Sequence, residues 1–353
     1  MRKLFTIILA LQFICSFSQT TEELVTASNL FLETLNEQEN KEILQKFSDS
    51  LRTEWTNLPS GMVKRPGKKL GDLSNASKTT LHELLITIFS SQGYLKVTSI
   101  MQLDDILNNG AKAAFEEEFI KEKLFLQTKK LGWNYNNFFI SIWNQPSLTK
   151  PWGIKFEGHH LSINITVFGE HVSFTPMFIG AGSEVLPFTK HIGLRYLSKE
   201  EDYGIKLINS FNEEQKKQAT LNEEVPKDII TNPDSDKRIT DYNGIKAEHL
   251  TNEQKQLLML LIKEYVNNLE NDKAQENLDK IKTSGVENIY FAWIGSYQSK
   301  APHYYIINGP DFIIEYDNVG FRNNGDHIHA IWREKINDFG EDILKTHHLK
   351  HKH

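Results

Sequence analysis

Apolar residues recur at helical spacing in the first third of the chain. Residues 20–50 are polar with apolar positions three and four apart, which predicts helices there. Residues 75–92 predict a helix with one apolar stripe, ended by Gly93 and built from Leu81, Leu84, Leu85, Ile88 and Phe89. Shorter helices are expected over 99–109 and 112–122.

Alternation of apolar and polar residues then predicts strands from Lys123 to Phe178, ending in a hairpin with its tip at Gly169-Glu170. Capping boxes at Ser198/Glu201 and Thr251/Gln254 predict two further helices. The segment 218–245 is polar and is expected to be a surface excursion. Residues 288–333 alternate again, and a short helix follows.

This order of elements predicts an α+β protein with helices packed on a mainly antiparallel sheet that ends in a C-terminal β-meander. We expect a single large domain over 19–353, and two lobes divided near residue 215 are the alternative. The sequence shows no internal repeat and no Gly-rich phosphate loop.

The N-terminus has the pattern of a cleaved signal peptide. Two basic residues precede an apolar run over 4–17, and Ser16 and Ser18 stand at the positions expected before a cleavage site. The apolar run is shorter than the ~20 residues of a membrane span. Export to the periplasm or the medium, with cleavage after Ser18 and no transmembrane anchor, is therefore expected.

Charge and cysteine content narrow the chemistry further. The 353 residues include 46 acidic and 40 basic side chains, giving a net charge of −6, which argues against a nucleic-acid partner. The only cysteine, Cys15, lies in the predicted signal peptide. The mature chain is therefore expected to have neither a disulfide nor a thiolate metal site.

The first stretch with candidate chemistry is residues 152–164. If Phe168 pairs with His171, one strand face is apolar and the other carries His160, Ser162 and Asn164. His159 would then point to the opposite side from His160, unless Gly158 bulges the strand. A solvated polar face with a buried His159 is the alternative.

The second stretch runs from residue 311 to residue 333. Pairing Asp317 with His327 would place Glu315 opposite His329 and Asp311 opposite Arg333, so that every pair is complementary. A turn at 308–311 would bring Tyr304 beside Glu315.

Two histidines on one strand face beside carboxylates suit a divalent transition metal. The candidate metal ligands are His160, His327 and His329, with His159 as the alternative. The metal would be zinc, copper or iron, because the ligands offer nitrogen and oxygen only. A histidine–carboxylate ladder that binds nothing is the competing interpretation, and the sequence alone does not bring the two stretches together in space.

Other polar residues in or beside these two stretches are assigned the remaining candidate roles. Glu315 and Asp317 are the candidate catalytic carboxylates, and Asn164, Tyr304 and Arg333 are candidate substrate-binding residues. Histidines at 347, 348, 351 and 353 form a tail that could also capture metal.

A series of short motifs resembles the secreted family known as domain of unknown function 3500. The motifs occur in order along the chain: Trp152-Gly153, Gly158-His159-His160-Leu161-Ser162, Phe291-Ala292-Trp293, Gly309-Pro310, Glu315-Tyr316-Asp317-Asn318, His327-Ile328-His329, Trp332-Arg333 and Asn337-Asp338-Phe339-Gly340. The resemblance implies an exported single-domain protein and implies no activity.

Three hypotheses follow from the sequence. The first is an exported metalloenzyme using the histidine–carboxylate site. The second is a metal-free binding protein or hydrolase for a small or oligomeric polar ligand, such as a glycan or peptide fragment. The third is a structural envelope protein. The oligomeric state is not predicted.

Overall fold

The computed structural model describes residues 21–350, apart from 49, 183–188, 234, 236–238 and 321–322, and it describes side chains as far as residue 345. The predicted signal peptide, residues 1–18, lies outside the described residues.

One large sheet runs through the described chain, and the α+β prediction is confirmed. Its twelve strands include the path β1-β3-β4-β5-β7-β12-β11-β10-β9-β8, with β2 beside β3 and β6 beside β5. All of these pairs are antiparallel except β1 with β3. The strands are Leu44–Gln45 (β1), Lys68–Lys69 (β2), Phe139–Trp143 (β3), Trp152–Gly158 (β4), Leu161–Phe168 (β5), His171–Ser173 (β6), Met177–Gly182 (β7), Ile245–Lys246 (β8), Tyr290–Gly295 (β9), His303–Asn308 (β10), Phe312–Asp317 (β11) and His327–Glu334 (β12).

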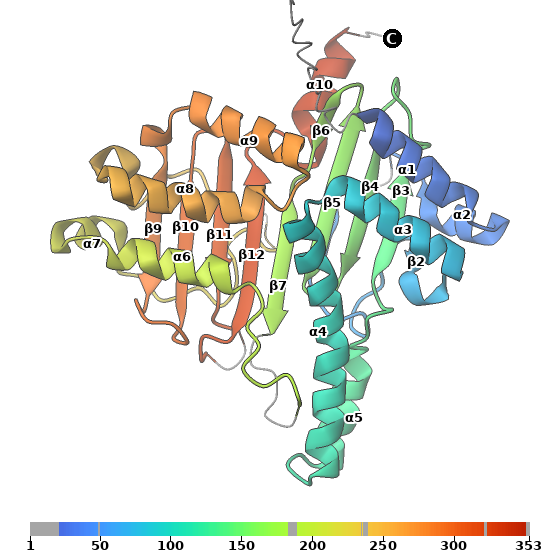
Figure 1. The fold of residues 1–353 in the computed structure, drawn as a ribbon, viewed down its shortest axis with the longest axis horizontal. Helices are drawn as coiled ribbons and strands as arrows, with labels where there is room; N and C mark the ends of the chain where they lie inside the picture. The colour runs from blue at the N-terminus through green and yellow to red at the C-terminus, as the bar shows by residue number, and fades with distance from the viewer. Residues whose placement is uncertain are drawn as a thin grey trace, which may run out of the picture.

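Helices cover one face of this sheet, which we call the helix face (Figure 1). The α-helices are Thr21–Glu33 (α1), Glu37–Ile43 (α2), Asn75–Ile88 (α3), Ser91–Glu116 (α4), Glu122–Leu131 (α5), Ser198–Asn209 (α6), Glu213–Ala219 (α7), Asn252–Val266 (α8), Asn271–Thr283 (α9) and Glu341–Lys350 (α10). Short 3₁₀ turns lie at Ser50–Arg52 (η1), Leu70–Asp72 (η2), Ala247–His249 (η3), Val286–Asn288 (η4) and Asp338–Gly340 (η5).

The core lies between the helices and the helix face of the sheet. Strand residues such as Ile154, Leu161 and Ile314 point into it, and helix residues such as Leu81 and Leu258 meet them there; all five are at most 2% exposed. Because side chains alternate along a strand, the polar residues between these positions point to the opposite face.

A common order of elements occurs twice in the structure, although the sequence shows no internal repeat. The first half runs from α1 to β7 and the second from α6 to β12. In each half a helix and a short capped helix precede a short strand, a 3₁₀ turn, two longer helices and an antiparallel meander. The capping box of α2, at Asn36 and Glu39, has its counterpart in α7 at Asn212 and Gln215.

The two halves meet along β7 and β12. These strands pair antiparallel in the middle of the sheet, from His327 opposite Gly182 to Trp332 opposite Met177. On the helix face, Phe89 forms a bridge with Leu269, and Lys96 makes ion pairs with Glu200 at 2.8 Å and Glu264 at 2.7 Å. A continuous sheet with these links forms one domain, not two lobes divided near residue 215.

Several predicted element boundaries are wrong. Ser90, not Gly93, separates α3 from α4, and its side chain accepts a hydrogen bond from the Gly93 amide. The region 99–122 holds most of one long helix, α4, and α5 then occupies the start of the expected β region. Leu197, not Ser198, precedes α6, and it makes no side-chain cap. The Thr251 capping box and the hairpin at Phe168 and His171 are confirmed.

The described residues of two long loops, which leave out 49, 234 and 236–238, lie over the other side of the sheet, which we call the loop face. The first covering loop, residues 46–67, is held by the buried Lys155 ammonium, which donates to the carbonyls of Leu51 and Glu54. The second covering loop, residues 220–244, is held by the buried Glu315 carboxylate, which accepts from the amides of Ile230 and Thr231. The buried Lys155 ammonium therefore holds the loop of the first half through carbonyl oxygens. The buried Glu315 carboxylate holds the loop of the second half through amide N–H groups.

The Glu315 contacts predict how firmly the second covering loop is held. Glu315→Gln replaces a charged acceptor of several hydrogen bonds by an amide, so we expect a loss of about 2 kcal/mol. Amide hydrogen exchange at Ile230 and Thr231 should accelerate by roughly 30-fold. Glu170→Gln, on the exposed hairpin tip, is the matched control. Unchanged exchange at both amides in Glu315→Gln would show that the carboxylate does not hold the loop.

Candidate metal centre

The turn between β4 and β5 places the first histidine. Gly158 pairs with Leu161, so His159 and His160 are the two turn residues and not strand residues as expected. His160 adopts a left-handed conformation with φ 59°, which histidine tolerates better than most residues. Its amide donates to the carbonyl of Asn57 at 3.1 Å, and its carbonyl accepts from the amide of Gly180 at 2.7 Å.

The start of β12 places the other two histidines. His327 and His329 are two residues apart and therefore point to the same face of the sheet, as predicted. The predicted register is displaced by two residues, because Asp317 lies opposite His329 and Glu315 opposite Ile331. A two-residue displacement preserves the face on which each side chain lies, so these residues remain on the loop face.

Three imidazoles converge across the seam between the halves. Nε2 of His327 lies 2.9 Å from Nε2 of His160 and 3.1 Å from Nε2 of His329. We call His160, His327 and His329 the imidazole triad. They are the one group among the described residues whose ligand atoms are arranged to hold a metal ion, all within 4.8 Å of one another. Three nitrogens on a tetrahedral ion with bonds of 2.0–2.1 Å would lie about 3.3 Å apart, so the triad fits such an ion after small adjustments.

Burial keeps two of these imidazoles neutral. Together with the neighbouring imidazoles, it lowers the pKa of His327 to about 3 and that of His160 well below its usual range. Neutral imidazole is the form that binds a metal.

Carboxylates hydrogen-bond to the ring of His329 in the triad and to the ring of the neighbouring His159. Nδ1 of His329 donates to Asp228 at 2.7 Å, which leaves the lone pair of its Nε2 directed into the triad. Nδ1 of His159 donates to Asp104 on α4 at 2.6 Å, and the His159 ring stacks on His160 with centroids 3.9 Å apart. No local sequence signal marks either aspartate, since Asp228 and Asp104 lie 101 and 55 residues from their histidine partners.

Of the two predicted catalytic carboxylates, only Asp317 keeps an unpaired oxygen. Its Oδ1 accepts from the Val319 amide at 3.1 Å, whereas the buried Oδ2 has no hydrogen-bond partner among the described residues. Burial, together with the charges of Asp228 and Glu315, raises the pKa of Asp317 to about 8. Both oxygens of Glu315 accept hydrogen bonds, from the second covering loop and from the Tyr304 hydroxyl at 2.7 Å.

The predicted substrate-binding residues all make internal hydrogen bonds. Asn164 donates to Ser162 and to the Pro176 carbonyl, and Tyr304 donates to Glu315. Arg333 donates to Thr231 and Asp338, and it lies four residues along β12 from His329, about 13 Å away.

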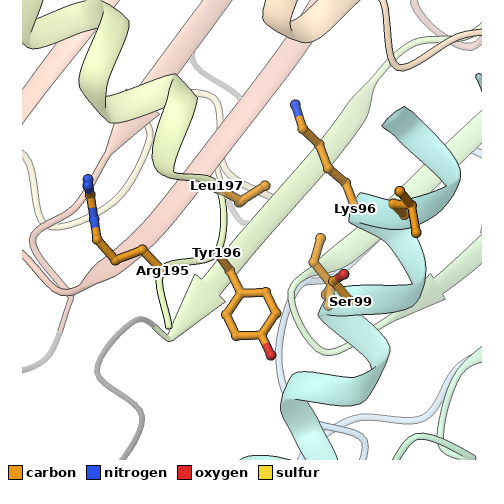
Figure 2. Close-up of a pocket in the computed structure, with 7 residues that line it drawn as sticks. Lys96, Ser99, Arg195, Tyr196 and Leu197 are labelled. Atoms are coloured by element: carbon orange, nitrogen blue, oxygen red, sulfur yellow. The ribbon is translucent and has the colours of Figure 1, made fainter. Parts of the chain in front are cut away.

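Two cavities of the described residues are lined by residues outside the triad. One of about 190 Å³ lies between α4 and the segment before α6, where Figure 2 shows Lys96, Ser99, Arg195 and Tyr196. Another of about 300 Å³ lies beside α7. The charges in the first are already paired, since Lys96 binds two glutamates and Arg195 binds Glu201 and Asp202. The first cavity therefore offers no unpaired charged group that points to a ligand.

Gly180 provides the space in which the triad forms. A Cβ at this position would lie 2.8 Å from the Ile328 carbonyl oxygen, 3.1 Å from His160 Cδ2 and 3.2 Å from His329 Cδ2. Gly182, two residues along β7 on the same face, has room, because its Cβ would meet nothing closer than 3.9 Å.

This pair of glycines gives a matched test. Gly180→Ala should lower the free energy of unfolding by about 1–3 kcal/mol through overpacking. It should also weaken binding of zinc by at least roughly tenfold, because ring displacements of a few tenths of an ångström spoil the ligand geometry. Gly182→Ala should change both quantities little. Equal effects of the two substitutions, by thermal unfolding and metal titration, would show that Gly180 is not shaping the site.

The buried imidazoles also predict a dependence of stability on pH in the metal-free protein. The pKa of His327 is about 3 in the folded chain and about 6.5 in the unfolded chain. Between these values the unfolded chain binds a proton that the folded chain does not. Stability is therefore full above pH ~6.5 and falls with decreasing pH, by up to about 1.4 kcal/mol per unit from this group.

His327→Gln should flatten this slope by roughly one proton in denaturant titrations between pH 4 and 6.5. His171→Gln, on the exposed start of β6, is the control and should keep the wild-type slope. A wild-type slope in His327→Gln would mean that His327 is protonated in the folded protein.

Comparison with known proteins gives a family and no activity. No curated protein and no solved structure matches the chain. None of the described helices has the length and apolar character needed to cross a membrane. The family model described as protein of unknown function (DUF3500) matches residues 17–341, and the chain therefore belongs to this family.

Proposed function

We propose that this protein is a metal-dependent enzyme that holds one divalent transition metal on His160, His327 and His329. The observation that carries the proposal is the convergence of three imidazoles from two halves of the chain on one point. Nε2 of His327 lies within about 3 Å of Nε2 of both other histidines, so the three rings present nitrogen atoms to one small space that a cation could occupy.

The ligand set limits the metal. Three imidazoles without thiolate suit zinc, copper or iron, and a magnesium or calcium ion would require mainly oxygen ligands. When bound, such a metal would supply activation of water for hydrolysis, or of dioxygen if it is copper or iron.

The protein residues around the triad would take distinct roles. Asp228 fixes the tautomer and orientation of His329, and Asp104 holds the His159 ring against His160. We assign proton transfer to Asp317, which is opposite His329 in the strand register and has an unpaired oxygen. Glu315, although named with Asp317 as a catalytic candidate, is better suited to holding the second covering loop.

The substrate-binding roles of Asn164, Tyr304 and Arg333 stay predictions, as does export through the signal peptide. Export would place the enzyme in the periplasm or outside the cell. A metal-free binding protein for a polar ligand is the alternative that the test below distinguishes.

The proposal predicts the metal content of the natively exported protein, purified without an affinity metal column. Near-stoichiometric zinc, copper or iron is expected by elemental analysis. The metal should remain when the chain ends at Thr346, because this truncation removes the four tail histidines and leaves the imidazole triad intact. His329→Gln should lose most of it, and His171→Gln, an exposed histidine outside the triad, should not.

Metal lost with the tail, or absent from both forms, would overturn the metalloenzyme. The same protein should then be titrated with glycans and short peptides, where binding that needs Asp317 or Asn164 would support the metal-free alternative.

A further inference from the structure

A helical arm, residues 110–131, projects beyond the end of the sheet (Figure 1). It consists of the last part of α4 and the whole of α5, held together by Phe115 and Phe125 with ring centroids 4.6 Å apart. Its buried residues are Gly110, Ala111 and Ala114, all on α4, and α5 has none. The arm therefore has almost no core within one copy of the chain.

The second half of the chain forms its part of the sheet without such an arm. In the second half, α9 has 13 residues and leads through η4 directly into β9. In the first half, α4 has 26 residues and α5 is added before β3. The arm is therefore an insertion into a fold that does not need it for its sheet or its core.

Large apolar side chains of the arm face solvent. Phe119 is 71% exposed, Leu124 47% and Leu126 49%. A pair of short helices gains little stability in water from helix propensity alone, so burial of such residues against another layer is the usual solution. Apolar residues clustered on a projecting element mark an interaction surface.

The charges of the arm are arranged by position along it. Its tip, residues 116–123, carries Glu116, Glu117, Glu118 and Glu122 against Lys121 and Lys123, a net charge of −2. Its root, at the end of α5, carries Lys129 and Lys130, a net charge of +2. The ten-residue helix α5, about 15 Å long, runs from the tip to the root.

We propose that the arm is a homodimerisation element, in which two copies of the chain pack their arms antiparallel about a two-fold axis. In this arrangement the acidic tip of each arm meets the basic root of the other. Phe119 is buried between the arms together with one flank of α5, since Leu124 and Leu126 lie on opposite flanks of that helix. Two helices from each copy then form a four-helix bundle, a packing that buries apolar faces no single arm can bury.

The root of the arm is joined to the first covering loop. The Gly61 amide donates to the Leu131 carbonyl at 2.9 Å, and the Ser60 hydroxyl donates to the Gly132 carbonyl at 3.2 Å. The same loop accepts the hydrogen bond from the His160 amide through Asn57. The dimer would therefore form beside the imidazole triad, although its formation requires no metal.

Analytical ultracentrifugation of the natively exported protein tests the dimer by charge exchange. The molar mass measured for the wild type should be twice that of one chain. The variant with Glu116→Lys, Glu117→Lys and Glu118→Lys should be monomeric, and so should Lys129→Glu with Lys130→Glu, because each brings like charges together. An equimolar mixture of the two variants should recover the dimer, because tip and root are again complementary, and this recovery would also show that both are folded.

The control is Glu213→Lys with Glu214→Lys on α7, two exposed glutamates outside the arm, which should remain dimeric. A monomeric wild type, or a dimer that both arm variants leave intact, would overturn the proposal. Because the readout is mass alone, a failed dimer leaves the metal proposal untouched, and absence of metal leaves the dimer proposal untouched.

Discussion

The pairing of β7 with β12 is the contact on which the rest of this structure depends. Each half ends its meander in one of these strands, and their antiparallel register turns two partial sheets into one. The register also sets the site, because it puts Gly180 opposite His329 and Gly182 opposite His327. With no side chain on β7 at these positions, His160 can reach over the strand from its turn to both histidines of β12.

The loop face adds a second constraint, because it is both polar and buried. Lys155 and Glu315 are at most 1% exposed, and a charge at such a position is costly unless it is hydrogen-bonded. The two covering loops provide these partners, carbonyls for the lysine and amides for the glutamate. The loops in turn bring in groups that serve the triad, since Asn57 binds the backbone of His160 and Asp228 binds the ring of His329. Buried charges thus hold the segments that orient the histidines.

Much of the fold could be predicted from the sequence, because it depends on periodicity. The alternation in β11 and β12 correctly placed Glu315, Asp317, His327 and His329 on one face, even though the register was displaced by two residues, since the side-chain period is also two. The Thr251 capping box was recognised for a similar local reason. The repeated order of elements was not predicted, because additional elements interrupt it in the first half, namely β1, η1, α5 and β6.

The site could be predicted only in part, because its remaining features depend on tertiary contacts. Reading His159 and His160 as strand residues put them on opposite faces, whereas in a two-residue turn their rings stack and His160 reaches the seam. Asp104 and Asp228 come from a helix and a covering loop with no motif to mark them. The hydrogen bonds that engage Glu315, Tyr304 and Arg333 likewise involve partners that sequence spacing cannot identify.

A metal centre at the imidazole triad can be tested most directly by crystallography. The natively exported protein would be crystallised and its diffraction recorded at the absorption edge of the metal it contains. The account predicts one anomalous peak about 2.0–2.1 Å from Nε2 of each of His160, His327 and His329. The three rings in mutual contact with no peak between them, or a metal bound only elsewhere on the chain, would contradict it.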